Sequence, residues 1–193
     1  MNFSEQMDFN RANRKAVQFI EAATEDYVSC RCCLINGLFT GMVLGAQAIE
    51  KYLKAFALFK DPTLSEKRYN HQIKALVSLV SDQEPKIEPV QFGDLFDRLE
   101  SYYKTRYPGT AGAATEMSTG EMDRIDRFVL HLYDLLPIPE EAKFGNYGYF
   151  CLVFLSKDGT ISPYEEWLKL KNTALQGAWS SLESRYDAAR RSV

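Results

Sequence analysis

The sequence predicts an all-α fold in which five helices form a bundle, followed by a strand or hairpin and a long final helix. Apolar residues recur every three or four positions along most of the chain, as on one face of a helix. Prolines and an Asn-Gly pair interrupt this pattern, and the segment after Pro139 is aromatic and β-branched instead. The 193 residues suit one bundle domain, 1–140, with a C-terminal appendage, 141–193. The five helices are predicted over residues 10–33, 38–60, 71–81, 91–105 and 118–136.

The first two helices are separated by the turn-forming pair Asn36-Gly37. The second is apolar nearly all round, so it should be central to the bundle. Its small residues Gly41, Gly45 and Ala48 form a ridge where another helix can approach closely. The buried side of the first helix is predicted to consist of Val17, Ile20, Tyr27 and Val28. The few polar residues of the second form one narrow stripe: Gln47, Glu50, Lys51 and Lys54.

The third and fourth helices are short and lie between prolines. Asn70 can cap the third helix, and Pro85 and Pro89 mark the loop that follows it. The fourth ends before Pro108, because proline cannot continue a helix comfortably. Their inward residues are predicted to be Ile73, Leu76, Val77 and Val80 in the third helix and Phe92, Leu95, Phe96, Leu99 and Tyr103 in the fourth.

The fifth helix begins at a capping box, with Ser118 at the cap and Glu121 three residues later, and ends before Pro137. Its apolar side is broad and its opposite, polar sector is narrow. The apolar side contains Met122, Ile125, Phe128, Val129, Leu132 and Leu136. The polar sector contains Asp123, Arg124, Arg127, His131 and Asp134.

The C-terminal appendage has a different character. Residues 148–155, GYFCLVFL, read as a strand that runs into a Lys-Asp-Gly turn, as in a small hairpin. Ser162 and Glu165 then form a second capping box, with Pro163 at the first helical position. One long amphipathic helix is predicted from there to about Arg190, packed on the bundle or on a second copy of the chain.

Composition and charge exclude several classes of protein. The formal net charge of -3 gives no overall attraction to nucleic acid or to anionic membranes, so any RNA contact must be local. The N-terminus lacks the pattern of a signal peptide, and the longest apolar segment, residues 34–49, is too short to span a bilayer. We therefore expect a cytoplasmic protein with no membrane partner.

The cysteines do not predict a metal site. Cys30 and Cys33 form one C-x-x-C pair, but a structural zinc site needs four ligands and there is no second pair. Small buried side chains on a helix are the preferred interpretation. No Gly-rich phosphate loop precedes a helix, so no cofactor is expected either.

The polar sector of the fifth helix offers the clearest catalytic hypothesis. Arg124, Arg127 and His131 lie on one side of that helix. RNA can be cleaved without a metal ion when its own 2′-hydroxyl attacks the adjacent phosphate. Histidine can then act as the acid or base that transfers the proton. Arginine can stabilise the negative charge that develops on the phosphate. The alternative is a solvated face on which Asp123 and Asp134 neutralise the arginines.

Three segments in order resemble the HEPN domain family. Residues 46–59, AQAIEKYLKAFALF, resemble a helix signature with Glu50, Lys51, Lys54 and Ala55 in the usual places. NHQIKALVSL, residues 70–79, resembles the segment in which a histidine opens the next helix. YYKTRYP, residues 102–108, resembles the Arg-Tyr-Pro ending of a bacterial branch. The resemblance covers about residues 10–136.

The resemblance implies an up-and-down helical bundle that forms a homodimer. Many HEPN members are metal-independent ribonucleases, often toxins paired with a nucleotidyltransferase, and others bind nucleotides or act as non-catalytic partners. We therefore predict a dimeric nucleotide- or RNA-handling or interaction module, partnered with a nucleotidyltransferase in a toxin–antitoxin or defence system. The alternative is an endoribonuclease that uses an arginine–histidine pair. The nuclease branch spaces that pair by four to six residues, as Arg124 and His131 are, but its position after the arginine is usually polar and here is Ile125.

A second candidate site follows from the family's shared polar residues. Lys51, Lys54, His71 and Arg106 are predicted to hold the phosphate of a nucleotide. A salt-bridged seam of the bundle explains the same residues equally well, with Arg106 tied to Glu50 and His71 bonded to backbone at the start of its helix.

Overall fold

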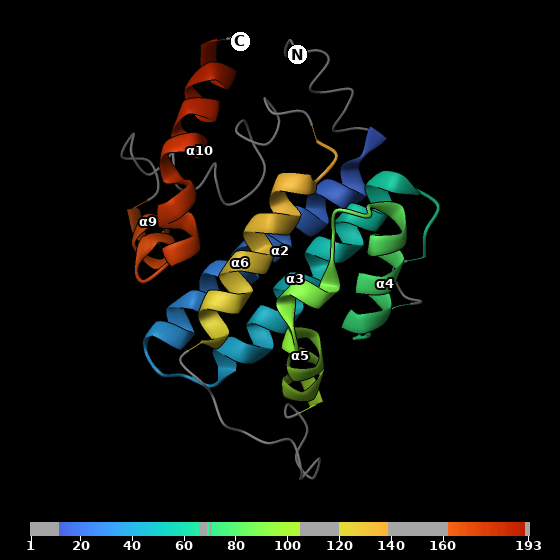
Figure 1. The fold of residues 1–193 in the computed structure, drawn as a ribbon, viewed down its shortest axis with the longest axis horizontal. Helices are drawn as coiled ribbons and strands as arrows, with labels where there is room; N and C mark the ends of the chain where they lie inside the picture. Colours follow the sequence, from blue (N-terminus) through green and yellow to red (C-terminus); the bar gives the residue numbers. More distant parts are fainter. Residues whose placement is uncertain (1–11, 66–68, 70, 105–119, 139–161, 192–193) are drawn as a thin grey trace.

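The structure is a computed structural model that describes residues 12–65, 69, 71–104, 120–138 and 162–191 (Figure 1). All regular secondary structure in these ranges is helical, which confirms the predicted all-α bundle. None of the described helices is both long and apolar enough to cross a bilayer. The helices are α2 (Arg14–Ile35), α3 (Thr40–Lys60), α4 (Ile73–Gln83), α5 (Leu95–Lys104), α6 (Glu121–Leu135), α9 (Ser162–Lys169) and α10 (Thr173–Arg191), with a short 3-10 helix, η2 (Pro89–Phe92), before α5.

Helix α3 is central, as its sequence predicts. It contacts α2, α4, α5 and α6, and Figure 1 shows it among these helices. Fourteen of its 21 residues are buried, including Ile49, Leu53 and Phe56, which have no exposed surface. A helix that is apolar nearly all round has to be covered on every side, and here four neighbours cover it.

The ridge of small residues on α3 allows α2 and α6 to approach closely, as predicted. A Cβ atom added to Gly41 would lie 2.8 Å from the Cys30 carbonyl oxygen and 2.7 Å from the Leu34 side chain, both on α2. A Cβ added to Gly45 would lie 2.9 Å from Cδ1 of Ile125 on α6. A methyl group at Gly41 would meet the backbone of α2 and would force the helices apart, whereas one at Gly45 would require the Ile125 side chain to move.

Replacing Gly41 with alanine should lower the free energy of unfolding by about 1–3 kcal/mol, because the new methyl group meets the backbone of α2. The matched control is Gly177→Ala in α10, where an added Cβ meets no atom within 4 Å. That substitution should raise stability by about 0.5–1 kcal/mol through helix propensity alone. Urea unfolding of both variants measures the difference, and equal effects would show that α2 and α3 are not in close contact.

Two predicted helix boundaries are wrong for reasons of backbone geometry. The third helix was expected to begin at His71, but His71 has φ of 60°, which no right-handed helix accommodates, so α4 begins at Ile73. The fourth was expected to begin at residue 91. Instead η2 ends at Phe92, and Gly93, with φ of 59°, separates it from α5.

The start of α6 also differs from the predicted capping box. Glu121 is its first residue rather than its third, and Ser118 lies outside the described residues. The Glu121 carboxylate is buried and forms an ion pair with Arg98 of α5, with Oε1 and Nη2 2.5 Å apart. The glutamate therefore joins two helices instead of capping its own.

The predicted strand or hairpin at 148–155 lies outside the described residues, and the single long final helix is wrong. Helix α9 ends at Lys169 and α10 begins at Thr173. Lys171 between them has φ of 57°, a left-handed conformation that ends a helix. The Asn172 side chain caps α10, because its Oδ1 accepts a hydrogen bond of 2.8 Å from the backbone N–H of Leu175.

A buried polar network joins these two helices to the bundle. Arg31 of α2 has no exposed surface; its guanidinium forms an ion pair with Asp126 of α6. The same guanidinium donates to the carbonyls of Trp167 (2.8 Å) and Leu170 at the C-terminal end of α9. A cation at the C-terminal end of a helix binds the unpaired carbonyls there and interacts favourably with the helix dipole. This contact fixes α9 on α2 and thereby determines where α10 begins.

Candidate functional site

The candidate site lies on the polar face of α6, beside η2. Arg124, Arg127 and His131 line one open hollow of about 560 Å³, together with Gln91, Phe92, Gly93 and Asp123. The three predicted residues therefore do meet at one place. The other side of the hollow is formed by the end of the 3-10 helix and by Gly93, which follows it.

Each of the two arginines is balanced by a carboxylate. Nη1 of Arg124 lies 2.5 Å from Oδ1 of Asp94, and its Nη2 lies 3.7 Å from Glu121. Nε of Arg127 lies 2.9 Å from Oδ2 of Asp123, one turn earlier on α6. The Arg127 side chain is nonetheless 65% exposed, and the Arg124 side chain 36%. A guanidinium has five N–H donors, so both arginines retain donors for a ligand.

His131 is held at the rim of the hollow by backbone and by an aromatic ring. Its Nε2 lies 3.1 Å from the carbonyl oxygen of Lys86, and its ring centre lies 5.5 Å from that of Phe92. Since a carbonyl only accepts hydrogen bonds, Nε2 must carry the proton. In the neutral imidazole Nδ1 is then the acceptor. Neither Phe92 nor Lys86 has a local sequence signal that places it at this site, because both come from the segment before α5.

Three residues of the second predicted set, Lys51, Lys54 and His71, each contact a carboxylate of the bundle. Nζ of Lys51 lies 2.6 Å from Asp26 on α2, and Nζ of Lys54 lies 2.7 Å from Glu50, one turn before it. Nδ1 of His71 lies 3.2 Å from the other oxygen of Glu50. These are the contacts of a salt-bridged seam between helices, and they include a buried Glu50–Lys54 pair. Arg106 lies outside the described residues.

The three cysteines of α2 are free thiols on the helix. Cys30 is fully buried against Gly45, and burial raises the pKa of its thiol, so the thiol stays protonated. Cys32 and Cys33 are partly exposed. Among the residues that the structure describes, no three His, Cys, Asp or Glu side chains are arranged to hold a metal ion.

The described residues form an all-helical bundle around an apolar central helix, and a late helix carries arginine and histidine on one face. A comparison with known families identifies the class of protein to which this bundle belongs. The family model of the HEPN domain matches residues 14–131, from the start of α2 to His131. This is more than half of the chain, and the protein belongs to the HEPN family. Neither the curated proteins nor the solved structures contain a match to the chain. Family membership makes it, in general terms, a nucleotide- or RNA-related module.

Proposed function

We propose that this HEPN protein binds RNA or nucleotides through the α6 face and does not cleave them. The observation that carries the proposal is the hollow shared by Arg124, Arg127 and His131 with the Phe92 ring. Arginine side chains hold phosphate in a bidentate manner, and an aromatic ring offers a surface on which a base can stack. The Glu-Lys-x-x-Lys-Ala and Arg-Tyr-Pro segments support placing the chain in the bacterial branch of the family.

Binding is favoured over catalysis by the charges around the arginines. Asp94 and Asp123 each lie within 3 Å of an arginine, so the face carries little net positive charge. Stabilising the additional negative charge of a phosphoryl transition state requires cations that are not already neutralised. The residue after Arg124 is Ile125, whose side chain is buried in the core and contributes nothing polar to the site.

The alternative function, a metal-independent endoribonuclease, is favoured by the orientation of His131. Because the Lys86 carbonyl holds the Nε2–H, Nδ1 is the basic nitrogen of the neutral ring. In this reaction Nδ1 takes the proton of a ribose 2′-hydroxyl, and the 2′-oxygen attacks the adjacent phosphorus. The 5′-oxygen leaves and takes a proton from solvent, which gives a cyclic phosphate. Arg127 is the cation placed to bind the phosphate.

We also propose that the chain forms a homodimer and pairs with a nucleotidyltransferase, as members of a toxin–antitoxin or defence system do. The support is family membership together with the accessibility of the α6 face, on which Arg127 is largely exposed. Light scattering of the purified protein tests the dimer. A monomer at all concentrations would contradict it and would leave the α6 face as a single-chain site.

One experiment separates binding from cleavage. The purified protein is mixed with a fluorescent single-stranded RNA in EDTA at low salt, beside Arg124→Ala, His131→Ala and the control Lys74→Ala. Lys74 lies on α4 in an exposed ion pair with Asp97. We expect the parent and Lys74→Ala to bind intact RNA and the two α6 variants to bind more weakly. Cleavage by the parent that both α6 variants lose would support the nuclease instead. Absence of binding would contradict both.

A further inference from the structure

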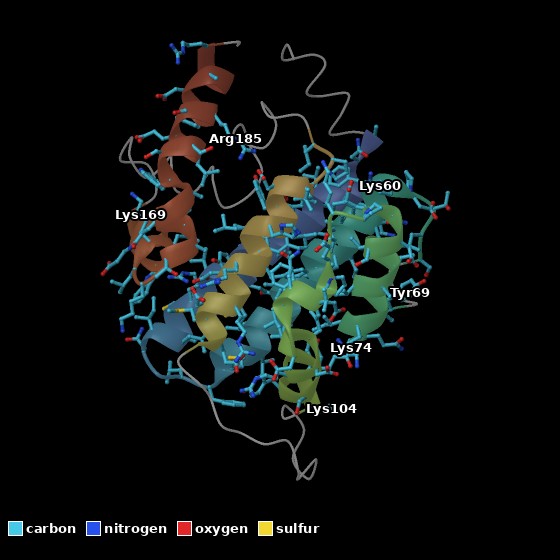
Figure 2. The ribbon with its side chains drawn as sticks, in the orientation of Figure 1. Lys60, Tyr69, Lys74, Lys104, Lys169 and Arg185 are labelled. Atoms are coloured by element: carbon cyan, nitrogen blue, oxygen red, sulfur yellow. The ribbon has the colours of Figure 1, made fainter. Side chains whose placement is uncertain are left out.

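Helix α10 runs beside the polar face of α6 and bonds to it at two positions, Thr173 and Arg185. The Thr173 hydroxyl donates to Oδ1 of Asp123 (2.6 Å), and Nη1 of Arg185 donates to Oδ1 of Asp134 (2.8 Å). Residues 173–185 of α10 thus run alongside residues 123–134 of α6 in the same direction, over about 17 Å at a rise of about 1.5 Å per residue. Figure 2 labels Arg185 on the side of α10 that faces α6.

Between these two hydrogen bonds the helices border an open groove of about 330 Å³, which we call the α6–α10 groove. Its α10 side carries small residues where larger ones would close it. The apolar floor and the polar rim are contributed by both helices. The lining residues that matter here are Arg127, His131 and Asp134 on α6 and Ala178, Leu182 and Arg185 on α10.

The α6–α10 groove adjoins the hollow described above, and the two share Arg127 and His131. A ligand that occupies both must therefore pass this pair. Helix α10 also contacts Arg127 indirectly, through Asp123. Thr173 bonds one carboxylate oxygen of Asp123, and Arg127 pairs with the other oxygen at 2.9 Å. Helix α10 thus helps to orient the arginine at the junction.

Arg185 supplies a cation at the far end of the groove. Its side chain is 29% exposed and lies against Asp134, whose side chain is 61% exposed. The ion pair with Asp134 uses Nη1, and the partly exposed guanidinium places its positive charge at this end of the groove. The arrangement of an apolar floor between Arg127 and Arg185 suits a base with a phosphate at each side.

We propose that the α6–α10 groove is a second nucleotide subsite, so that the protein binds single-stranded RNA across both hollows. The inference rests on the proposed function of the α6 face and adds α10 to it. The base in the groove lies on the floor at Ala178, the phosphate that joins the two nucleotides lies at Arg127 and His131, and Arg185 contacts the next phosphate. A duplex cannot use this site, because its paired bases are not available to enter a groove between two helices.

The α10 side of this subsite lies outside the part of the chain that matches the family. The HEPN match ends at residue 131, whereas Arg185 and Ala178 belong to α10. The groove exists because Arg31 and Asn172 fix the start of α10 against the bundle, through the carbonyls of α9 and through the hydrogen bond of Asn172 to Tyr27. The specificity of this protein for a strand rather than a single nucleotide is therefore assigned to its C-terminal helices.

The test measures binding of a fluorescent single-stranded RNA over a range of salt concentrations. Arg185→Gln should weaken binding about fivefold to tenfold and reduce the slope of log affinity against log salt by about 0.7, the value for one phosphate contact with a single strand. Its control, Arg191→Gln, changes an exposed arginine of α10 that bonds its own helix at Asp187. Ala178→Phe should block the groove, and Ser180→Phe, exposed on the same helix, should not.

Asp134→Asn distinguishes a binding role of Arg185 from a structural one. The substitution removes a negative charge beside the position proposed for the phosphate, so affinity for RNA should rise. If Arg185 only fixes α10, affinity should be unchanged or fall. The subsite is contradicted if Arg124→Ala weakens RNA binding while Arg185→Gln and Ala178→Phe leave it at the parent level; the proposed function then still stands. If the parent binds no single-stranded RNA, both are contradicted.

Discussion

Replacing Arg31 with methionine is expected to lower the free energy of unfolding by about 3–5 kcal/mol, since removing one partner of a buried ion pair leaves the other charge uncompensated. Arg31 and Asp126 are both fully buried. The carbonyls of Trp167 and Leu170 lose their donor in the same variant. Urea unfolding measures the change, and α9 and α10 should become accessible to protease first.

Two controls distinguish the effect of breaking the buried ion pair from the effect of removing one arginine of α2. Arg14→Met, at an exposed position on the same helix, should change stability by no more than about 0.5 kcal/mol. The double variant Arg31→Met, Asp126→Leu should recover a large part of the loss, because no charge is left buried. Equal stability of Arg31→Met and Arg14→Met would show that the ion pair does not hold the C-terminal helices.

The loss in Arg31→Met should also depend on pH. Burial raises the pKa of the Asp126 carboxyl, and Arg31 and Tyr27 oppose that shift. Without Arg31 the folded-state pKa rises further above the unfolded value, so the folded state favours the protonated acid. Its contribution to stability is present at acid pH and lost as the pH rises through the folded-state pKa. The variant should therefore be closest to the parent under acidic conditions.

Reversing both arginines of the α6 face, Arg124→Glu with Arg127→Glu, should reduce affinity for single-stranded RNA by about 100-fold or more, because two charge-assisted contacts are lost and two repulsive ones are added. Loss of the exposed ion pairs should cost about 0–1 kcal/mol each, and repulsion from Asp94, Asp123 and Glu121 adds to that cost. Fluorescence anisotropy measures the affinity and thermal unfolding the stability. Lys74→Glu reverses an equivalent exposed charge on α4 and should leave RNA binding unchanged.

The parts of the fold that follow from periodicity are predicted correctly. Helix α3 is central because its sequence has no broad polar face, and the small residues at Gly41 and Gly45 meet α2 and α6 as expected. The polar sector of α6 also brings Arg124, Arg127 and His131 to one hollow. Spacing on one helix is sufficient to predict these features.

Features that depend on contacts between distant segments are missed. Nothing local indicates that His71 and Lys171 adopt positive φ, because neither residue type requires it. The polar stripe on α3 gives no sign that Lys51 pairs with Asp26 of α2 while Lys54 pairs within α3. The wall of the site at Phe92 depends on a 3-10 turn that apolar periodicity cannot distinguish from a first turn of α5.

The buried ion pair of Arg31 and Asp126 has a signature in the sequence. Arg31 follows Tyr27 and Val28 by four and three residues, so it lies on the apolar stripe of α2. Asp126 lies beside Ile125 and three residues before Val129, on the apolar side of α6. Opposite charges on the buried sides of two helices predict a buried ion pair, because neither charge is stable there alone.

The most direct test of the RNA-binding face uses the fact that the chain contains only two histidines, one in each candidate site. The imidazole signals of His131 and His71 are followed by NMR while single-stranded RNA is added. If RNA binds at the α6 face, the chemical shifts of His131 should change until the site is saturated with RNA. Those of His71, which contacts Glu50, should stay unchanged. Shifts at His71 with His131 unchanged would contradict the account and would place binding at the seam of Lys51 and Lys54.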